Sequence, residues 1–90
     1  MKVQLAPELL NKLKKEDVRV RKSFKKAIEL FSNDPLNLEL DNHELEREWE
    51  GFRSIDVTAD LRAIYQEDKE GETTTAYFVA FGTHKELYRE

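Results

Sequence analysis

The chain contains no cysteine among its 90 residues. This absence excludes a disulfide framework and any cysteine-ligated metal site, and it fits a reducing compartment. The sequence also lacks a run approaching the roughly 20 apolar residues of a membrane-spanning helix, and its first residues lack the apolar core of a signal peptide. We therefore expect a cytoplasmic protein.

Several short motifs that mark common catalytic chemistries are missing as well. There is no phosphate-binding G-x-x-x-x-G-K-[ST], no nucleophile elbow and no H-E-x-x-H zinc motif. The two histidines, His43 and His84, are separated by 41 positions, which matches no recognised metal-ligand spacing. The sequence therefore predicts neither a metal nor another cofactor.

An excess of positive charge is absent too, because 19 Asp and Glu against 15 Lys and Arg give a net charge of −4. This balance disfavours nucleic-acid binding, which depends on Lys and Arg to neutralise phosphates. The charges are unevenly distributed, however. Residues 1–31 hold nine basic and four acidic side chains, whereas residues 32–90 hold six and fifteen. Lys22, Lys25 and Lys26 could therefore bind RNA, or they form an ordinary solvated helix face.

The length predicts one domain spanning residues 1–90, with 39% hydrophobic residues available for a modest core. Alternation predicts a strand over 2–5, and leucine spacing predicts a helix over about 9–15. A second helix begins after an N-cap at 16–17 and ends before Pro35, which cannot continue it. Its apolar stripe comprises Val20, Phe24, Ile28 and Phe31.

Three strands are predicted in the second half, over 52–57, 61–67 and 74–81, whereas residues 36–50 show no sustained period and are assigned to a loop. The expected fold class is α+β, in the order strand, helix, helix and three strands, with the helices on one face of a mainly antiparallel sheet. The other face is then free for a site. The candidates for the covered face are Phe52, Ile55, Tyr65, Tyr77 and Val79.

A set of groups suited to metal-free phosphodiester chemistry occurs between His43 and Tyr88. An imidazole has a pKa of about 6.5 when unperturbed and can accept a proton at neutral pH, so His43 is a candidate general base. Alternatively, it is a surface histidine in an acidic loop. Arg53 and Arg62 could each hold two phosphate oxygens, or each could form a cross-strand ion pair. Arg62 points away from the face of Leu61 and Ala63, and we expect it on the open face.

These residues occur in an order that resembles the RelE/StbE-type toxins of bacterial toxin–antitoxin modules, especially the YafQ-like branch. A segment H-x-L-x-x-x-W-x-G-[FY]-R corresponds to residues 43–53, and G-T-H-x-x-L-[FY] corresponds to residues 82–88. The stretch LRAIY at 61–65 is similar to the arginine-bearing strand of RelE. The resemblance implies a RelE-like fold and a toxin that cleaves messenger RNA on the ribosome without a metal.

The same resemblance implies roles for individual residues. His43 corresponds to the general base, His84 to a general acid or phosphate contact, and Arg62 to the group that stabilises the transition state. Tyr88 would stack on a base or pack beneath the C-terminus. Asp60 matches a family aspartate and Asp56 stands where the family has a histidine, so both are candidate catalytic residues. Asp56 could accept a proton or orient His43, but its charge repels the phosphate. Ala80 replaces a family arginine. Trp49 is expected to be a partly buried lid on the loop.

Two kinds of partner follow from the resemblance: the ribosome with its messenger RNA, and an antitoxin of the RelB/DinJ kind whose extended arm wraps the toxin. The acidic balance, Asp56 and Ala80 keep a different class open. In that class the chain is a non-catalytic binding toxin of the gyrase-directed ParE type, or an inactive RelE-like domain.

Overall fold

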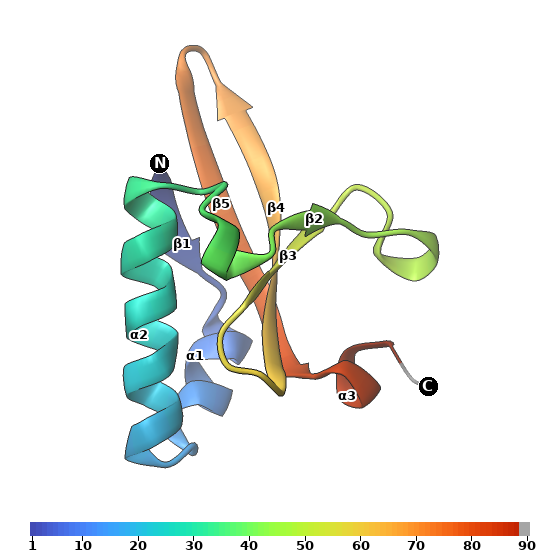
Figure 1. Cartoon of the computed structure of the whole chain (residues 1–90). Coiled ribbons are helices and arrows are strands. Elements are labelled where there is room, and N and C mark those ends of the chain that lie inside the picture. The colour runs from blue at the N-terminus through green and yellow to red at the C-terminus, as the bar shows by residue number, and fades with distance from the viewer. Residues whose placement is uncertain (89–90) are drawn as a thin grey trace.

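The computed structural model describes residues 1–88, which form one five-stranded sheet with two helices packed on one face (Figure 1). The strands lie in the order β1-β5-β4-β3-β2, and only the pairing of β1 (Lys2–Leu5) with β5 (Thr73–Thr83) is parallel. β2 (His43–Glu44), β3 (Arg53–Asp56) and β4 (Leu61–Glu70) complete an antiparallel series. The predicted α+β class is confirmed. Within the described residues, no helix is both long and apolar enough to cross a membrane.

The helix α2 (Val18–Asn33) forms where its apolar stripe predicts it. Asp17 caps its start, with Oδ1 accepting a hydrogen bond from the Val20 N–H at 3.0 Å. Phe24 and Phe31 are buried, while Val20 and Ile28 are partly buried against the core. The shorter α1 (Pro7–Lys14) begins at a proline, whose fixed φ suits a first helical turn, and it buries Leu9.

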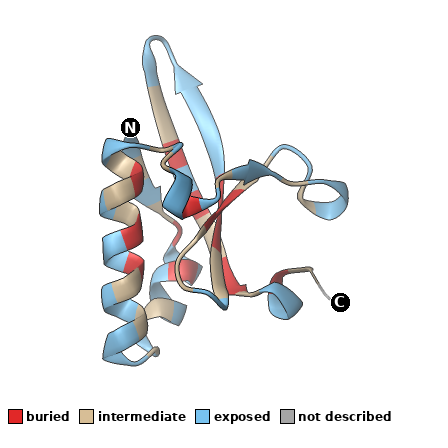
Figure 2. Ribbon diagram, in the orientation of Figure 1, coloured by how far each residue is buried: buried red, intermediate tan, exposed pale blue. Residues whose placement is uncertain are grey.

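The core lies between α2 and the sheet (Figure 2). Phe31 is fully buried, with its ring centroid 4.9 Å from that of Tyr65 and 5.3 Å from that of Phe78. Phe24 lies against Phe81 at 5.6 Å. These tilted and edge-on aromatic contacts join α2 to the neighbouring strands β4 and β5.

The predicted covered face is correct for Ile55 and Tyr65 and wrong for Phe52, Tyr77 and Val79. Ala76 and Phe78 are buried instead, and Tyr77 is 36% exposed. The alternation changes at a β-bulge, because Ile64 pairs with Ala80 whereas Tyr65 pairs with Phe78, leaving Val79 as the extra residue. Phe52 precedes β3 and packs on Trp49.

The assignment of residues 36–50 to a loop is also wrong. This segment contains the 3-10 turn η1 (Leu38–Leu40), the short strand β2 and a second 3-10 turn, η2 (Arg47–Trp49). Asn37 caps η1 through a hydrogen bond from the Glu39 N–H, and Asp41 then adopts a left-handed conformation with φ of 45°. A strand of two residues is too short to produce a period of two in the sequence.

Candidate functional site

His43 and His84 line the same open groove, which we call the histidine groove and which has a volume of about 700 Å³. His43 belongs to the edge strand β2, and His84 is the first residue of α3 (His84–Tyr88). η2 and its flanking residues also line this groove. The remaining lining residues are Glu44, Leu45, Glu46, Arg47, Glu48, Trp49 and Tyr88.

A capping box fixes the start of α3 and therefore the place of His84. The Thr83 hydroxyl accepts from the Glu86 N–H at 3.1 Å, and the Glu86 carboxylate accepts from the Thr83 N–H at 2.8 Å. Hydrogen bonding of the Glu86 carboxylate with the backbone and side chain of Thr83, together with the charge of Lys12, whose Nζ lies 3.8 Å from Glu86 Oε2, holds the pKa of Glu86 below its ordinary value. Lys12 also donates to the Phe81 carbonyl at 2.6 Å, which ties α1 to the end of β5.

Aromatic side chains connect α3 to η2. The Trp49 indole N–H donates to the Leu87 carbonyl at 2.9 Å, and its ring meets Phe52 edge-on at 5.4 Å. Trp49 is partly buried, as expected for a lid on this segment. Tyr88 packs edge-on against His84, with the two ring centroids 4.4 Å apart.

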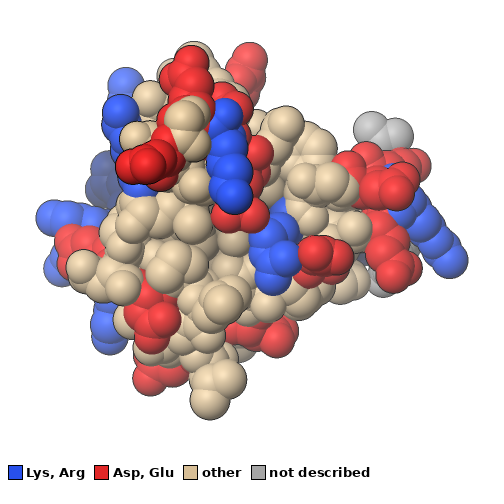
Figure 3. Space-filling model, turned by 90° about the horizontal axis from the view of Figure 1, so that it is seen from above, with Lys and Arg blue, Asp and Glu red and all other residues tan. Residues whose placement is uncertain are grey.

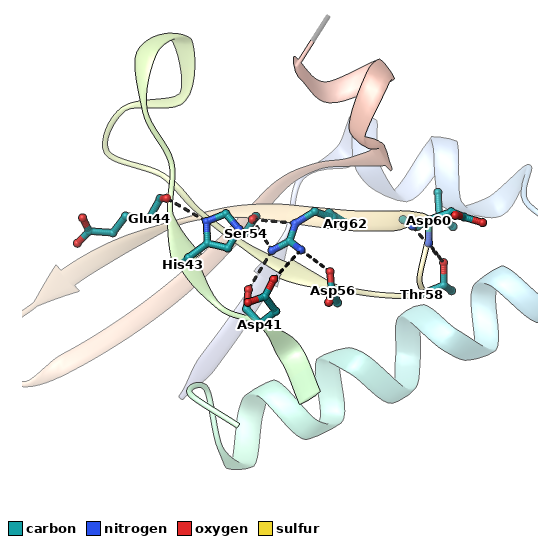
Figure 4. A network of polar contacts seen from close by, with 9 residues as sticks. Asp41, His43, Glu44, Ser54, Asp56, Thr58, Asp60 and Arg62 are labelled. Atoms are coloured by element: carbon teal, nitrogen blue, oxygen red, sulfur yellow. Dashed lines mark hydrogen bonds and ion pairs between the residues drawn. The ribbon is translucent and has the colours of Figure 1, made fainter. Parts of the chain in front are cut away.

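Arg62 lies on the open face of the sheet, as predicted, but its donors are already occupied (Figure 4). Nε and Nη2 donate to the Ser54 hydroxyl at 3.1 and 2.8 Å, and Nη2 also donates to the Asp41 carbonyl at 3.0 Å. Nη1 contacts the carboxylates of Asp41, at 3.4 Å, and Asp56. A guanidinium has five N–H groups, and these five contacts match that number. The Arg62 side chain is only 13% exposed.

Arg53 projects toward the helix-covered face, because it is the cross-strand partner of the buried Tyr65. Its Nε donates to the Asn42 side-chain oxygen at 2.9 Å, and the Asn42 amide donates to the Tyr65 hydroxyl at 2.8 Å. Arg53 also pairs with Glu44 at 3.4 Å. Burial raises the pKa of Tyr65, although the hydrogen bond from Asn42 and the charge of Arg53 oppose the rise.

Other predicted site residues lie outside the histidine groove. Asp60 is exposed in the turn between β3 and β4, where its N–H donates to the Thr58 hydroxyl at 3.2 Å. Lys22, Lys25 and Lys26 are exposed on α2, which covers the face opposite Arg62. Figure 3 shows several basic side chains along the left edge, on the side of α2, and acidic side chains interspersed with a few basic ones over the middle and right.

Sequence reasoning missed Arg47 and Asn42. Among residues 1–88, Arg47 is the only arginine that lines the histidine groove, and its φ of 58° turns the chain at η2. It follows a glutamate and precedes another in a segment without periodicity, so no local pattern separates it from an ordinary exposed charge. Asn42 joins β3, β4 and the segment after α2 through its amide, and only the folded chain shows that connection. Within the described residues, no group of His, Asp and Glu is arranged to hold a metal ion.

Residues 7–89 match the model of a protein family described as "Bacterial toxin of type II toxin-antitoxin system, YafQ". The chain belongs to the YafQ toxin family. It is therefore a type II toxin–antitoxin toxin of the YafQ/RelE type, and the recognition from residues 43–53 and 82–88 is confirmed. No curated protein matches the chain.

Solved structures of other toxins have a fold similar to that of this chain. YafQ from E. coli strain BL21(DE3) superimposes with a TM-score of 0.75 at 22% identity, covering 97% of each chain. A YoeB/ParE toxin from Agrobacterium tumefaciens gives 0.74 at 17% identity, covering 93% of this chain and 99% of the other. The toxin fold in the E. coli DinJ-YafQ complex gives 0.66 at 22% identity, with 97% of each chain covered.

Proposed function

We propose that this YafQ-family toxin is an endoribonuclease that cleaves messenger RNA on the ribosome by metal-free acid–base chemistry. The observation that carries the proposal is that His43, on β2, and His84, on α3, line one groove, although 41 positions separate them. Two imidazoles in one groove can serve as proton acceptor and proton donor to one phosphodiester. Membership of the YafQ family supports the same activity.

The proposed reaction needs two proton transfers. His43 accepts the proton of the ribose 2′-OH while the 2′-oxygen attacks the adjacent phosphorus. The bond to the 5′-oxygen breaks, and His84 gives its proton to that oxygen as it departs. The products are a 2′,3′-cyclic phosphate on one fragment and a 5′-hydroxyl on the other. Tyr88, which packs on His84, offers a ring on which a neighbouring base can stack.

The charge of the groove supports a substrate that the ribosome presents. Arg47 is positioned to contact a phosphate, but Glu44, Glu46 and Glu48 line the same groove and repel one. The whole chain is also negative, at −4. Long-range attraction of free RNA is therefore weak, and a scaffold that holds the messenger in place removes that disadvantage. We expect cleavage of ribosome-bound messenger RNA to exceed cleavage of free RNA.

An antitoxin is the second proposed partner. E. coli YafQ, which shares this fold, was solved together with DinJ. We propose that a small RelB/DinJ-like protein encoded beside this toxin covers its site in the cytoplasm and prevents cleavage. An isolated complex that still cuts messenger RNA would contradict blocking by occupancy.

The activity is tested with programmed ribosomes, the purified toxin and the variants His43→Ala and His84→Ala. Each variant should cleave about 10²–10⁴-fold more slowly while circular dichroism remains unchanged. Lys69→Ala, on the exposed end of β4, serves as the control and should keep the wild-type rate. The upstream fragment should carry a 2′,3′-cyclic phosphate. Undiminished cleavage by both histidine variants would remove the acid–base scheme, and growth arrest without messenger cleavage would favour a ParE-like binding toxin.

A further inference from the structure

We infer that Arg62 is a positioning residue for His43 and not a ligand of the scissile phosphate. The inference begins with the path of the chain into β2. Asp41 has a left-handed backbone, and this turn directs the next two residues along the edge of β3, where His43 pairs with Ser54. A two-residue strand at a sheet edge has little pairing of its own, so its position depends on contacts at its ends.

Arg62 supplies those contacts on the open face. Its Nη2 donates to the Asp41 carbonyl at 3.0 Å, two residues before His43, and its Nε and Nη2 donate to Ser54, the cross-strand partner of His43. One guanidinium therefore binds both the entrance to β2 and the strand against which β2 lies. Figure 4 shows the Arg62 guanidinium between Asp41 and Ser54, with the His43 ring beside Ser54.

The same contacts leave Arg62 without a free donor. The carboxylates of Asp41 and Asp56 both contact Nη1 of Arg62, and their two negative charges offset the single positive charge of the guanidinium. A phosphate approaching Arg62 would have to displace a carboxylate and meet another one. Arg62 is also absent from the lining of the histidine groove, whereas His43, His84 and Arg47 are present in it.

Two explanations of Arg62 predict opposite effects when the carboxylates are neutralised. If Arg62 binds the phosphate, Asp41 and Asp56 compete with the substrate, and removing their charges should accelerate cleavage. If Arg62 positions His43, those charges hold the Arg62 guanidinium in place, and removing them should slow cleavage. Asparagine is the suitable replacement for Asp41, because it tolerates the left-handed backbone that alanine would strain.

The kinetic experiment, which rests on the proposed nuclease activity, compares Asp41→Asn, Asp56→Asn and their double variant on programmed ribosomes. We expect kcat to fall, with KM nearly unchanged, and Arg62→Met to lose on the order of 10²-fold, as expected for a displaced catalytic group. Asp68→Asn makes the same chemical change on the exposed part of β4 and should keep the wild-type rate. Faster cleavage by the double variant would overturn the inference.

A second measurement does not require activity. The Leu45 N–H, which donates to the Phe52 carbonyl at 2.9 Å, reports whether the segment beyond β2 remains on β3. In Arg62→Met and Arg62→Lys its hydrogen exchange should accelerate about tenfold or more, since charge-assisted hydrogen bonds are lost, while amides between β4 and β5 stay protected. Unchanged exchange at Leu45 would overturn the positioning role. If the wild-type toxin cuts no messenger RNA, the proposed nuclease fails and this exchange result alone decides the role of Arg62.

Discussion

The indole N–H of Trp49 donates to the carbonyl oxygen of Leu87 at 2.9 Å, and this bond joins η2 to α3. Residues of both elements line the histidine groove. A five-residue helix at the end of the chain cannot sustain itself by its own hydrogen bonds, so α3 depends on such tertiary contacts.

Trp49→Phe should therefore loosen α3 while keeping an aromatic ring against Phe52. The lost hydrogen bond contributes about 0.5–1.5 kcal/mol, and the loss should appear as faster hydrogen exchange in α3 with little change in α2. Tyr77→Phe, an exposed aromatic change on β5, is the control and should leave α3 unaffected. Equal exchange in the Trp49 variant and the wild type would show that the indole bond does not hold α3.

Acid should weaken the N-terminal cap of α3. The pKa of Glu86 is lowered by its hydrogen bonds from Thr83 and by Lys12, so its contribution to stability is present above the ordinary pKa of 4.5. That contribution is lost as the pH falls through the lowered value. Trp49, the single tryptophan, reports the change by fluorescence. Glu86→Gln should remove this pH-dependent step, and Glu70→Gln, on the β4–β5 hairpin, should retain it.

Tyr65 should make the fold sensitive to alkali. Burial raises the pKa of its hydroxyl above 10.0, so the protonated form stabilises the folded state fully below pH 10. The stability contribution is lost as the pH rises through the raised pKa. In urea titrations at increasing pH, Tyr65→Phe should show a shallower decline in unfolding free energy than the wild type. Parallel declines in the two proteins would exclude Tyr65 as the titrating group.

Phe31 is fully buried in the core, and its ring packs against those of Tyr65 and Phe78. Phe31→Ala should cost about 3–5 kcal/mol of unfolding free energy, and Phe24→Ala should cost a similar amount. Leu38→Ala is the matched apolar control, because Leu38 is 95% exposed and should change stability by less than about 0.5 kcal/mol. Chemical denaturation measures all three variants.

The lysines of α2 and the arginine of the groove should have separable effects. Lys25 and Lys26 lie on α2, across the sheet from Arg62, so Lys25→Ala with Lys26→Ala should raise KM for ribosomes and reduce its salt dependence without changing kcat. Arg47→Ala, in the groove, should lower kcat. A fall in kcat in the lysine variant would place α2 against the reacting RNA.

The helices could be predicted from sequence because their signals are local. Val20, Phe24, Ile28 and Phe31 recur at helical spacing, and proline marks the end of the segment. The face of β5 could not be predicted, because the bulge at Val79 shifts the alternation and depends on pairing with β4. The strand β2 was missed for a related reason: it exists through its pairing with β3, not through a pattern of its own.

The sequence by itself determined the family, the α+β class and the two histidines of the candidate site, since order and spacing along the chain are sufficient for each. Only the tertiary structure decided the surroundings of the arginines. Both are candidate phosphate ligands in the sequence, with Arg62 favoured as the catalytic group, yet strand register sends them to opposite faces, where Arg53 binds Asn42 and Arg62 binds Asp41. A guanidinium takes the acceptors that folding places around it, and sequence spacing does not show which acceptors those are.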